Sequence, residues 1–102
     1  MNKNRALYNK AHFSMREMNL LEDYLEEKNM PYKRRDIFDG EQILVLDADG
    51  NTMWDAIIHG GSYGHASGLL EIMGTIVDKT KTDDSVEGCL TAQDIIERIE
   101  RQ

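Results

Sequence analysis

Hydrophobic residues recur every three to four positions in the segment that follows Ser14. This spacing places them on one face of a helix. Ser14 and Glu17 have the form of a capping box, and Asn29-Met30-Pro31 interrupts the pattern. The pattern therefore predicts a helix over residues 15–28. Its apolar positions are Met18, Leu21 and Leu25, with Leu20 and Tyr24 beside them.

Two apolar runs rich in β-branched residues, 42–46 and 53–58, lie on either side of a short polar segment. That segment contains Asp49-Gly50-Asn51, and these residue types favour the positive φ angles of a tight turn. The runs therefore predict a β-hairpin. Residues 32–37 would add an outer strand or a loop, because Lys33-Arg34-Arg35 suits a solvated sheet edge.

Helical spacing returns in the second half of the chain, where apolar residues at 69, 72, 73 and 76 predict a short helix. The polar stretch 78–88 is predicted to be a mobile loop. Thr91 is a suitable N-cap for a last helix, with Asp94 in its first turn. The buried stripe of that helix would comprise Ile95, Ile96 and Ile99, and its outer face the pairs Asp94 with Arg98 and Glu97 with Arg101.

These elements together predict an α+β fold. A small antiparallel sheet of two or three strands, centred on the hairpin, would be covered by three helices in the order α-β-β-(β)-α-α. A chain of 102 residues is expected to form a single domain. Residues 1–13 have weaker periodicity, so they could prolong the first helix, fray or form an N-terminal extension.

The net charge of −7 is distributed unevenly. Residues 1–35 carry eight basic and five acidic side chains, whereas residues 36–78 carry eight acidic side chains and no basic one. An acidic surface repels phosphate backbones and lipid head groups and attracts cationic protein surfaces. A protein partner with a basic surface is therefore expected, with no direct binding to nucleic acid or membrane. Acidity that only keeps the domain soluble is the alternative.

The remaining composition narrows the class of protein. No apolar run approaches the roughly 18–20 residues that span a bilayer, and the first residues lack the apolar core of a signal peptide. We expect the protein to stay in the cytoplasm. Cys89 is the only cysteine in the sequence, so it cannot form an internal disulfide, and it is interpreted as a small buried hydrophobe.

The glycine-rich stretch 60–68 concentrates reactive side chains between a predicted strand and a predicted helix. The motif Gly-x-Ser-x-Gly is present in this stretch. Serine hydrolysis also needs a large parallel sheet and a base from elsewhere in the chain, and the sequence predicts neither. The glycine spacing and the absence of lysine do not fit a phosphate-binding loop. His59 and His65, with Asp55 or Glu71, have the chemistry of metal ligands, but their spacing fits no helix-based metal motif, so no metal and no cofactor are expected. If this loop binds a ligand, the candidates are His59, Ser62, Tyr63 and His65.

A tight strand-to-helix turn, in which glycines allow unusual dihedral angles, is the favoured interpretation of this stretch. The candidates for partner binding are instead the acidic residues of the hairpin region and one tryptophan, for which the centre of the core is the favoured alternative role. They are Asp36, Asp39, Glu41, Asp47, Asp49, Asp55 and Trp54.

Several short motifs together resemble a group of small proteins carried by phages and mobile elements of Gram-positive bacteria. The motifs are WDAIIH (54–59), GSYG (61–64), GLLEIMG (68–74), VEG (86–88) and LTAQD (90–94). The resemblance covers roughly residues 20–101 and implies a genomic setting, without an activity or a site.

Two classes of function follow from the sequence. The first is a small acidic, non-catalytic protein-binding module. In its most specific form it inhibits a host defence enzyme that binds nucleic acid, in the manner of an anti-CRISPR or anti-restriction protein, by occupying the cationic contacts that phosphates would use. The second is a small enzyme or a ligand- or metal-binding protein that uses the loop 60–68.

Overall fold

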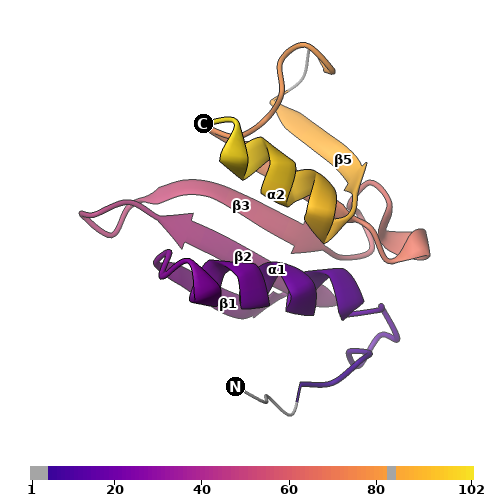
Figure 1. The fold of residues 1–102 in the computed structure, drawn as a ribbon. Helices are drawn as coiled ribbons and strands as arrows, with labels where there is room; N and C mark the ends of the chain where they lie inside the picture. The colour runs from indigo at the N-terminus through magenta and orange to yellow at the C-terminus, as the bar shows by residue number, and fades with distance from the viewer. Residues whose placement is uncertain (1–4, 83–84) are drawn as a thin grey trace.

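The computed structural model describes residues 5–82 and 85–102, which form two α-helices, one short 3₁₀ helix and five strands (Figure 1). The strands form one antiparallel sheet in the order β1-β2-β3-β4-β5, so that sequence neighbours are also spatial neighbours. The elements are α1 (Arg16–Glu27), β1 (Tyr32–Ile37), β2 (Gly40–Leu46), β3 (Thr52–Ile58), η1 (His65–Ser67), β4 (Leu70–Gly74), β5 (Val86–Leu90) and α2 (Ala92–Glu100).

Both α-helices lie on the same face of the sheet, as Figure 1 shows. The strands direct alternate residues towards them, because successive side chains of a strand point to opposite faces. Ile43, Ala56 and Ile72 are paired across β2, β3 and β4 and are fully buried on this face. The helices contribute the other half of the core, which includes Met15, Met18, Leu21, Leu25, Ala92 and Ile95.

The sequence predicted α1, α2 and both strands of the β2–β3 hairpin correctly. Residues 32–37, for which an outer strand and a loop were both considered, form the edge strand β1. In the β2–β3 turn, the Asp47 carboxylate accepts the backbone N–H groups of Asp49 and Asn51, each at 2.9 Å. Gly50 has a φ of 85°, as the Asp-Gly signal indicated. Thr91 and Asp94 form a reciprocal capping box at the start of α2.

The predicted fold class was wrong about the number of helices and strands. The expected helix at 69–76 is the strand β4, in which Ile72 pairs with Ala56 of β3. A short apolar run fits both helical and strand periods, and here the open edge of β3 supplied the hydrogen bonds. Gly74 has a φ of 114°, and a Cβ at this position would lie 2.5 Å from the Met53 carbonyl oxygen. The fold is therefore α+β, with two α-helices and a five-stranded antiparallel sheet, in the order helix, five strands, helix.

The predicted mobile loop 78–88 was also partly wrong, because Val86 begins the strand β5. Residues 83–84 of that loop lie outside the described residues. Glu87 of β5 is buried and accepts hydrogen bonds from the buried Arg98 of α2, including one of 3.1 Å from Nε. Arg98 therefore faces the sheet, and not solvent as its i,i+4 spacing suggested.

The start of α1 differs from the predicted capping box. Met15 is the N-cap and provides no side-chain cap, while Ser14 Oγ accepts the backbone N–H of Arg16 at 3.3 Å. The Glu17 carboxylate points elsewhere and accepts the backbone N–H of Ala92 at 2.7 Å, at the beginning of α2. This long-range contact links the two helices. The start of a helix binds carboxylates well because its first N–H groups have no partner within the helix.

Residues 5–13 do not prolong α1. They form a loop that turns back on the helix start, with the backbone N–H of Met15 donating to the Leu7 carbonyl at 2.7 Å. Residues 1–4, for which fraying or an extension was also considered, lie outside the described residues. In the described parts of the chain, no helix has the length and apolar character that crossing a membrane requires.

Candidate functional site

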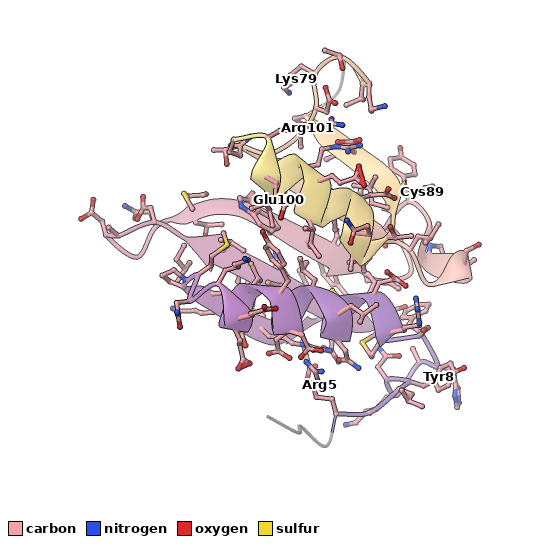
Figure 2. All side chains as sticks on the ribbon, viewed as in Figure 1. Arg5, Tyr8, Lys79, Cys89, Glu100 and Arg101 are labelled. Atoms are coloured by element: carbon pink, nitrogen blue, oxygen red, sulfur yellow. The ribbon has the colours of Figure 1, made fainter. Side chains whose placement is uncertain are left out.

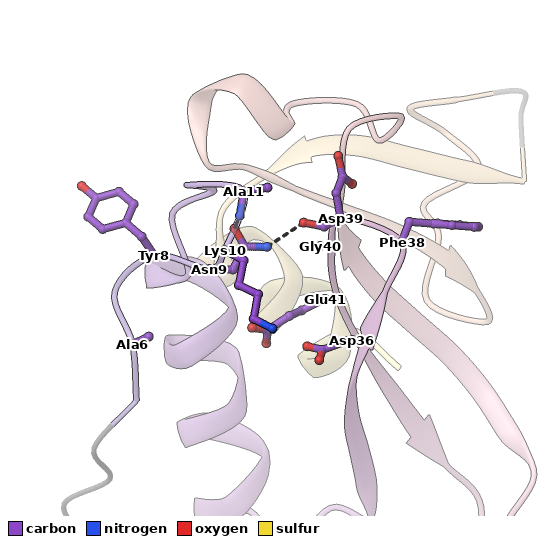
Figure 3. Close-up of a pocket in the computed structure, with 10 residues that line it drawn as sticks. All are labelled: Ala6, Tyr8, Asn9, Lys10, Ala11, Asp36, Phe38, Asp39, Gly40 and Glu41. Atoms are coloured by element: carbon purple, nitrogen blue, oxygen red, sulfur yellow. Dashed lines mark hydrogen bonds between the residues drawn. The ribbon is translucent and has the colours of Figure 1, made fainter.

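A groove of about 560 Å³ lies between the N-terminal loop and the β1–β2 hairpin (Figure 3). It brings together three of the seven partner-binding candidates from the sequence. One wall is Ala6, Tyr8, Asn9, Lys10 and Ala11, and the other is Asp36, Phe38, Asp39, Gly40 and Glu41. The two walls are thus more than twenty residues apart in the sequence, and only folding places them together.

Asn9 fixes the N-terminal wall. Its side-chain amide donates to the Asp39 carbonyl at 2.7 Å, the contact drawn in Figure 3. Its side-chain oxygen accepts the backbone N–H groups of Ala11 and Phe13 at 3.1 and 2.8 Å. A side chain that bonds its own loop and the opposite wall holds both in one arrangement. The groove is therefore a built feature of the fold.

An ion-pair network anchors the start of the same loop against α1. The Arg5 guanidinium donates to the Glu22 carboxylate at 2.9 Å, and Arg34 of β1 donates to the same carboxylate at 2.9 Å. Figure 2 shows Arg5 beside α1, with Tyr8 farther along the loop. Burial raises the pKa of Glu22, but hydrogen bonds from Arg5 and Tyr32 outweigh it and hold that pKa below its ordinary value. Glu22 therefore remains ionised between two arginines.

Tyr32 extends the network on the other side of Glu22. Its hydroxyl oxygen lies 2.8 Å from the Glu22 carboxylate and 3.0 Å from the Glu26 carboxylate, so its single proton can be donated to either. Burial and the hydrogen bond to Glu22 raise the pKa of Tyr32 to about 12. The phenol therefore stays protonated and acts as a structural donor between α1 and β1.

Carboxylates dominate the hairpin wall of the groove. Asp36 and Glu41 are directly opposite each other in the β1–β2 register, and Glu41 also accepts the Arg34 side chain at 2.6 Å. Asp36 and Asp39 are exposed, and one Asp39 oxygen accepts the backbone N–H of Gly60 at 2.9 Å. Figure 3 shows the Lys10 side chain reaching between the walls, towards the Glu41 and Asp36 carboxylates.

Phe38 stands at the tip of this hairpin and is 86% exposed. Its φ is 54°, a conformation that bulky residues rarely adopt. Its ring contacts the His59 ring edge-on at a centroid distance of 5.3 Å, but that contact leaves most of the ring in solvent. Tyr8 is also exposed, and Figure 3 shows the two rings pointing away from the groove on opposite sides. Two aromatic side chains thus flank an acidic groove.

The other partner-binding candidates lie elsewhere. Asp47 and Asp49 are in the β2–β3 turn, at the opposite end of β2 from Glu41. Asp55 lies on the sheet face away from the helices, where Gln42 donates to it at 2.6 Å. Trp54 is only 3% exposed and is part of the core, the other role considered for it. The acidic residues of the sequence therefore do not converge on one surface.

Structural hydrogen bonds engage the reactive groups of the glycine-rich loop. Ser62 is 3% exposed, and its hydroxyl accepts the backbone N–H of His59 and donates to the His59 carbonyl, both at 3.0 Å. The His59 ring accepts the backbone N–H of Gly61 at 2.9 Å through Nδ1. His65 Nδ1 lies 2.7 Å from the Ser62 carbonyl oxygen, to which it can donate. Ser62 and the two imidazole rings therefore form hydrogen bonds with the backbone of their own loop.

The rest of this loop is packed against β4 and β5. Tyr63 is exposed, but its backbone N–H donates to the Glu71 carboxylate and its carbonyl accepts the Cys89 N–H at 3.2 Å. Gly64 has a φ of 94°, and a Cβ there would lie 2.8 Å from the Cys89 Cα. Cys89 is exposed, contrary to its interpretation as a buried hydrophobe. No group of three or more potential metal ligands occurs among residues 5–82 and 85–102.

Sequence reasoning missed Phe38 and the whole N-terminal wall of the groove. A signal for Phe38 was present, because Asp39-Gly40 is a turn dipeptide between two strand-like runs and indicates a second hairpin with Phe38 at its tip. The positions of Tyr8, Asn9 and Lys10 beside the hairpin had no signal in the sequence, since the hydrogen bond from Asn9 to Asp39 and the ion pair of Arg5 with α1 place that loop.

Comparisons of this chain with known protein families, with curated proteins and with solved structures found no match.

Proposed function

We propose that this protein is a small, non-catalytic binding module of phage or mobile-element type. It acts in the cytoplasm and binds the basic surface of a host enzyme that acts on nucleic acid. In the most specific form of this proposal, it inhibits a defence nuclease by covering cationic residues that would otherwise hold phosphates. The binding site is the acidic groove with its two flanking aromatic residues.

Phe38 is the observation that carries the proposal. A bulky side chain with positive φ costs conformational energy, and such strain persists at sites where function requires it. Large aromatic side chains are the usual energetic anchors of protein interfaces. An exposed phenylalanine on a strained turn, with Asp36 and Asp39 on either side, combines an apolar anchor with a carboxylate rim.

The charge of the groove supports a basic partner. Asp36, Asp39 and Glu41 contribute three carboxylates to the groove. Among the residues that line the groove, Lys10 is the basic one, and Arg34 of the adjoining strand β1 forms an ion pair with Glu41. Exposed charges of this kind guide association within the roughly 8–10 Å Debye length, so binding would weaken with salt. A duplex or single-stranded nucleic acid would be repelled from the same surface.

The test is capture of host proteins on the immobilised protein at low and at high salt, read by mass spectrometry. We expect salt-sensitive capture of a basic nucleic-acid enzyme, whose activity the protein then inhibits when both are purified. Asp36→Lys should weaken that binding at least about tenfold, since it reverses a charge at the groove. Asp49→Lys is the matched control, because it makes the same change at the opposite end of β2 and should leave binding nearly unchanged.

Two outcomes would contradict this proposal. One is failure to capture any protein at low salt. The other is equal binding by wild type and Asp36→Lys, which would show that the captured enzyme uses a different surface.

A further inference from the structure

The N-terminal wall of the acidic groove packs only weakly against the rest of the protein. None of residues 5–12 belongs to the hydrophobic core, whereas Phe13, which follows them, packs against it. Residues 6–8 and 10–12 are exposed, and the exposed fractions of Leu7 and Tyr8 are 69% and 61%. We name residues 5–12 the strap. Because the strap buries little apolar surface, its position depends on polar contacts.

Arg5 fastens one end of the strap to α1. Its guanidinium forms ion pairs with the Glu22 and Asp23 carboxylates at 2.9 and 2.8 Å, and it donates to the Asn19 carbonyl at 3.1 Å. The Asp23 side chain is more than half exposed, so salt screens that ion pair. Arg5 Nε is buried without a hydrogen-bond partner among residues 5–82 and 85–102, which costs free energy. Opening of the strap would remove this cost, because water then reaches the Arg5 side chain.

Individual hydrogen bonds hold the middle of the strap. The Asn9 side-chain amide donates to the Asp39 carbonyl at 2.7 Å, on the opposite wall of the groove. The backbone N–H of Met15, the N-cap of α1, donates to the Leu7 carbonyl at 2.7 Å. These bonds can break while the sheet and both α-helices stay folded, because neither belongs to the hydrogen bonding of a strand or a helix. The strap is therefore able to open as a local unit.

The closed strap directs Lys10 into the groove. Figure 3 shows the Lys10 side chain between the two walls, directed towards the Glu41 and Asp36 carboxylates. These carboxylates are directly opposite each other in the β1–β2 register, and like charges in that position destabilise a strand pair. A nearby ammonium group offsets this repulsion. Lys10 forms no ion pair with another described residue, so it lies in the groove without being fixed there.

We propose that the strap is an autoinhibitory element, which holds Lys10 in the groove of the free protein and opens when a basic partner binds. This inference rests on the proposed function, because it concerns the regulation of the same groove. Lys10 occupies the space to which the carboxylates would attract a lysine or arginine of the partner. Closure of the strap and binding of the partner therefore compete for the same carboxylates.

The fraction of molecules with an open strap sets the strength of this inhibition. A partner that binds only the open form has an apparent dissociation constant equal to its intrinsic constant divided by the open fraction. A strap that is open about one-tenth of the time would therefore weaken binding about tenfold. Such a population is measurable, because local opening lets a backbone amide exchange its hydrogen much faster than global unfolding does.

Amide hydrogen exchange, followed by NMR, measures this opening without any partner. The Met15 amide reports on the strap, because its hydrogen bond to the Leu7 carbonyl breaks when the strap opens. The Leu21 amide, in the middle of α1, reports on global unfolding. After correction for intrinsic rates, we expect Met15 to exchange at least about a hundredfold faster than Leu21. Its rate should rise further in about 0.5 M NaCl, since salt screens the Arg5 ion pairs.

Arg5→Gln should raise the exchange rate of the Met15 amide at least about fivefold, because it removes both ion pairs of the strap. Arg16→Gln is the matched control, since it removes the same charge beside Met15, but Arg16 pairs with Glu17 inside α1. It should leave the Met15 rate nearly unchanged. The inference is overturned if Met15 exchanges as slowly as Leu21, or if Arg5→Gln has no effect on its rate, because the wall would then be rigid.

Titration with a capped tri-arginine peptide, followed by NMR shifts of the groove residues, tests the competition. Lys10→Gln should lower the dissociation constant of this peptide at least about threefold, because the groove loses its own cation. Lys28→Gln, which removes the same charge at the other end of α1, should lower it less. Equal dissociation constants for the two variants, or no binding of the peptide, would overturn the role of Lys10. Failure to capture a host protein would contradict the proposed function alone, since neither measurement on the strap uses a host protein.

Discussion

At the scale of the residue, a positive φ angle in a turn coincides with the most exposed aromatic side chain of the described residues. Phe38 occupies the first position of a two-residue hairpin turn with a φ of 54°. Glycine is the residue that adopts this conformation without strain. The chain therefore retains a less stable residue at the point that projects farthest from the hairpin.

Replacement of Phe38 by glycine should separate stability from function. We expect Phe38→Gly to raise the free energy of unfolding by up to about 1 kcal/mol through relief of backbone strain, while binding of the partner falls. Urea denaturation measures the first effect and the salt-dependent capture measures the second. Phe38→Ala is the control, since it removes the ring but keeps a Cβ. A Phe38→Gly protein no more stable than Phe38→Ala would show that the turn is not strained.

Asp55 should make the stability of the protein depend on pH. Burial raises its pKa in the folded state, so its contribution to stability is fully present below the unfolded value of about 3.8 and is lost as pH rises through the folded pKa. Asp55→Asn keeps an oxygen that can accept from Gln42 and removes the charge. At pH 7 it should be as stable as the wild type or more stable, by less than about 1 kcal/mol.

The measurement for Asp55 is urea denaturation between about pH 4 and pH 7. The Asp55→Asn protein should lose less stability over this range than the wild type does. Asp49→Asn is the control, because Asp49 is exposed in the β2–β3 turn. An unchanged pH dependence in Asp55→Asn would mean that Asp55 is not desolvated in solution.

At the scale of the element, side-chain contacts between distant parts of the chain hold α2 in place against β5 and α1. The buried pair Arg98 and Glu87 joins them, and hydrogen bonding from Arg98 holds the pKa of Glu87 below its ordinary value. The Glu17 carboxylate from α1 meets the start of α2 from the other side. The helix is thus fixed at its start and near its end by side chains far away in sequence.

Arg98→Ala should lower the free energy of unfolding by about 3 kcal/mol, because it leaves the Glu87 carboxylate buried without its partner. Urea denaturation measures this loss. The double variant Arg98→Met/Glu87→Gln should recover most of it, since no uncompensated charge remains. Arg101→Ala is the control on the same helix, because Arg101 is exposed and its contact with Asp78 at 3.3 Å should contribute little. Equal losses from both arginines would contradict the assigned role of the buried pair.

The same scale shows why the sequence predicted a helix where β4 forms. In the strand register, Leu70 and Ile72 face the helices and Glu71 lies on the opposite face, although all three residues are buried. The wider window that includes Leu69 and Ile76 also fits a helical period. Hydrogen bonds offered by β3 decided between the two, and no local propensity contains that information.

At the scale of the whole molecule, the acidic residues that are clustered in the sequence separate in space. Each antiparallel strand reverses the chain, so the β1–β2 turn with Asp39 and the β2–β3 turn with Asp49 lie at opposite ends of β2. Asp55, midway along β3, lies on the sheet face away from the helices instead. The acidic groove, which is the proposed contact surface, therefore contains only three of the seven candidates, Asp36, Asp39 and Glu41.

Local physics allowed the sequence alone to determine α1, α2, the β2–β3 hairpin and the edge position of β1. Periodicity, capping residues and turn dipeptides act within a few residues, and they specify these elements before any long-range contact forms. The α+β class followed from them. The choice of Asp36, Asp39 and Glu41 as binding candidates also came from sequence, through charge alone.

Only the tertiary structure decided the remaining features. β4 became a strand because β3 presented an edge with unpaired backbone groups, and β5 paired with the free edge of β4 in the same way. An unpaired buried backbone group is costly. The groove exists because Asn9 binds across to Asp39, and one face of the sheet has no α-helix because both α-helices pack on the other face. Such features depend on pairs of residues distant in the chain, and the identity of one partner does not reveal the other.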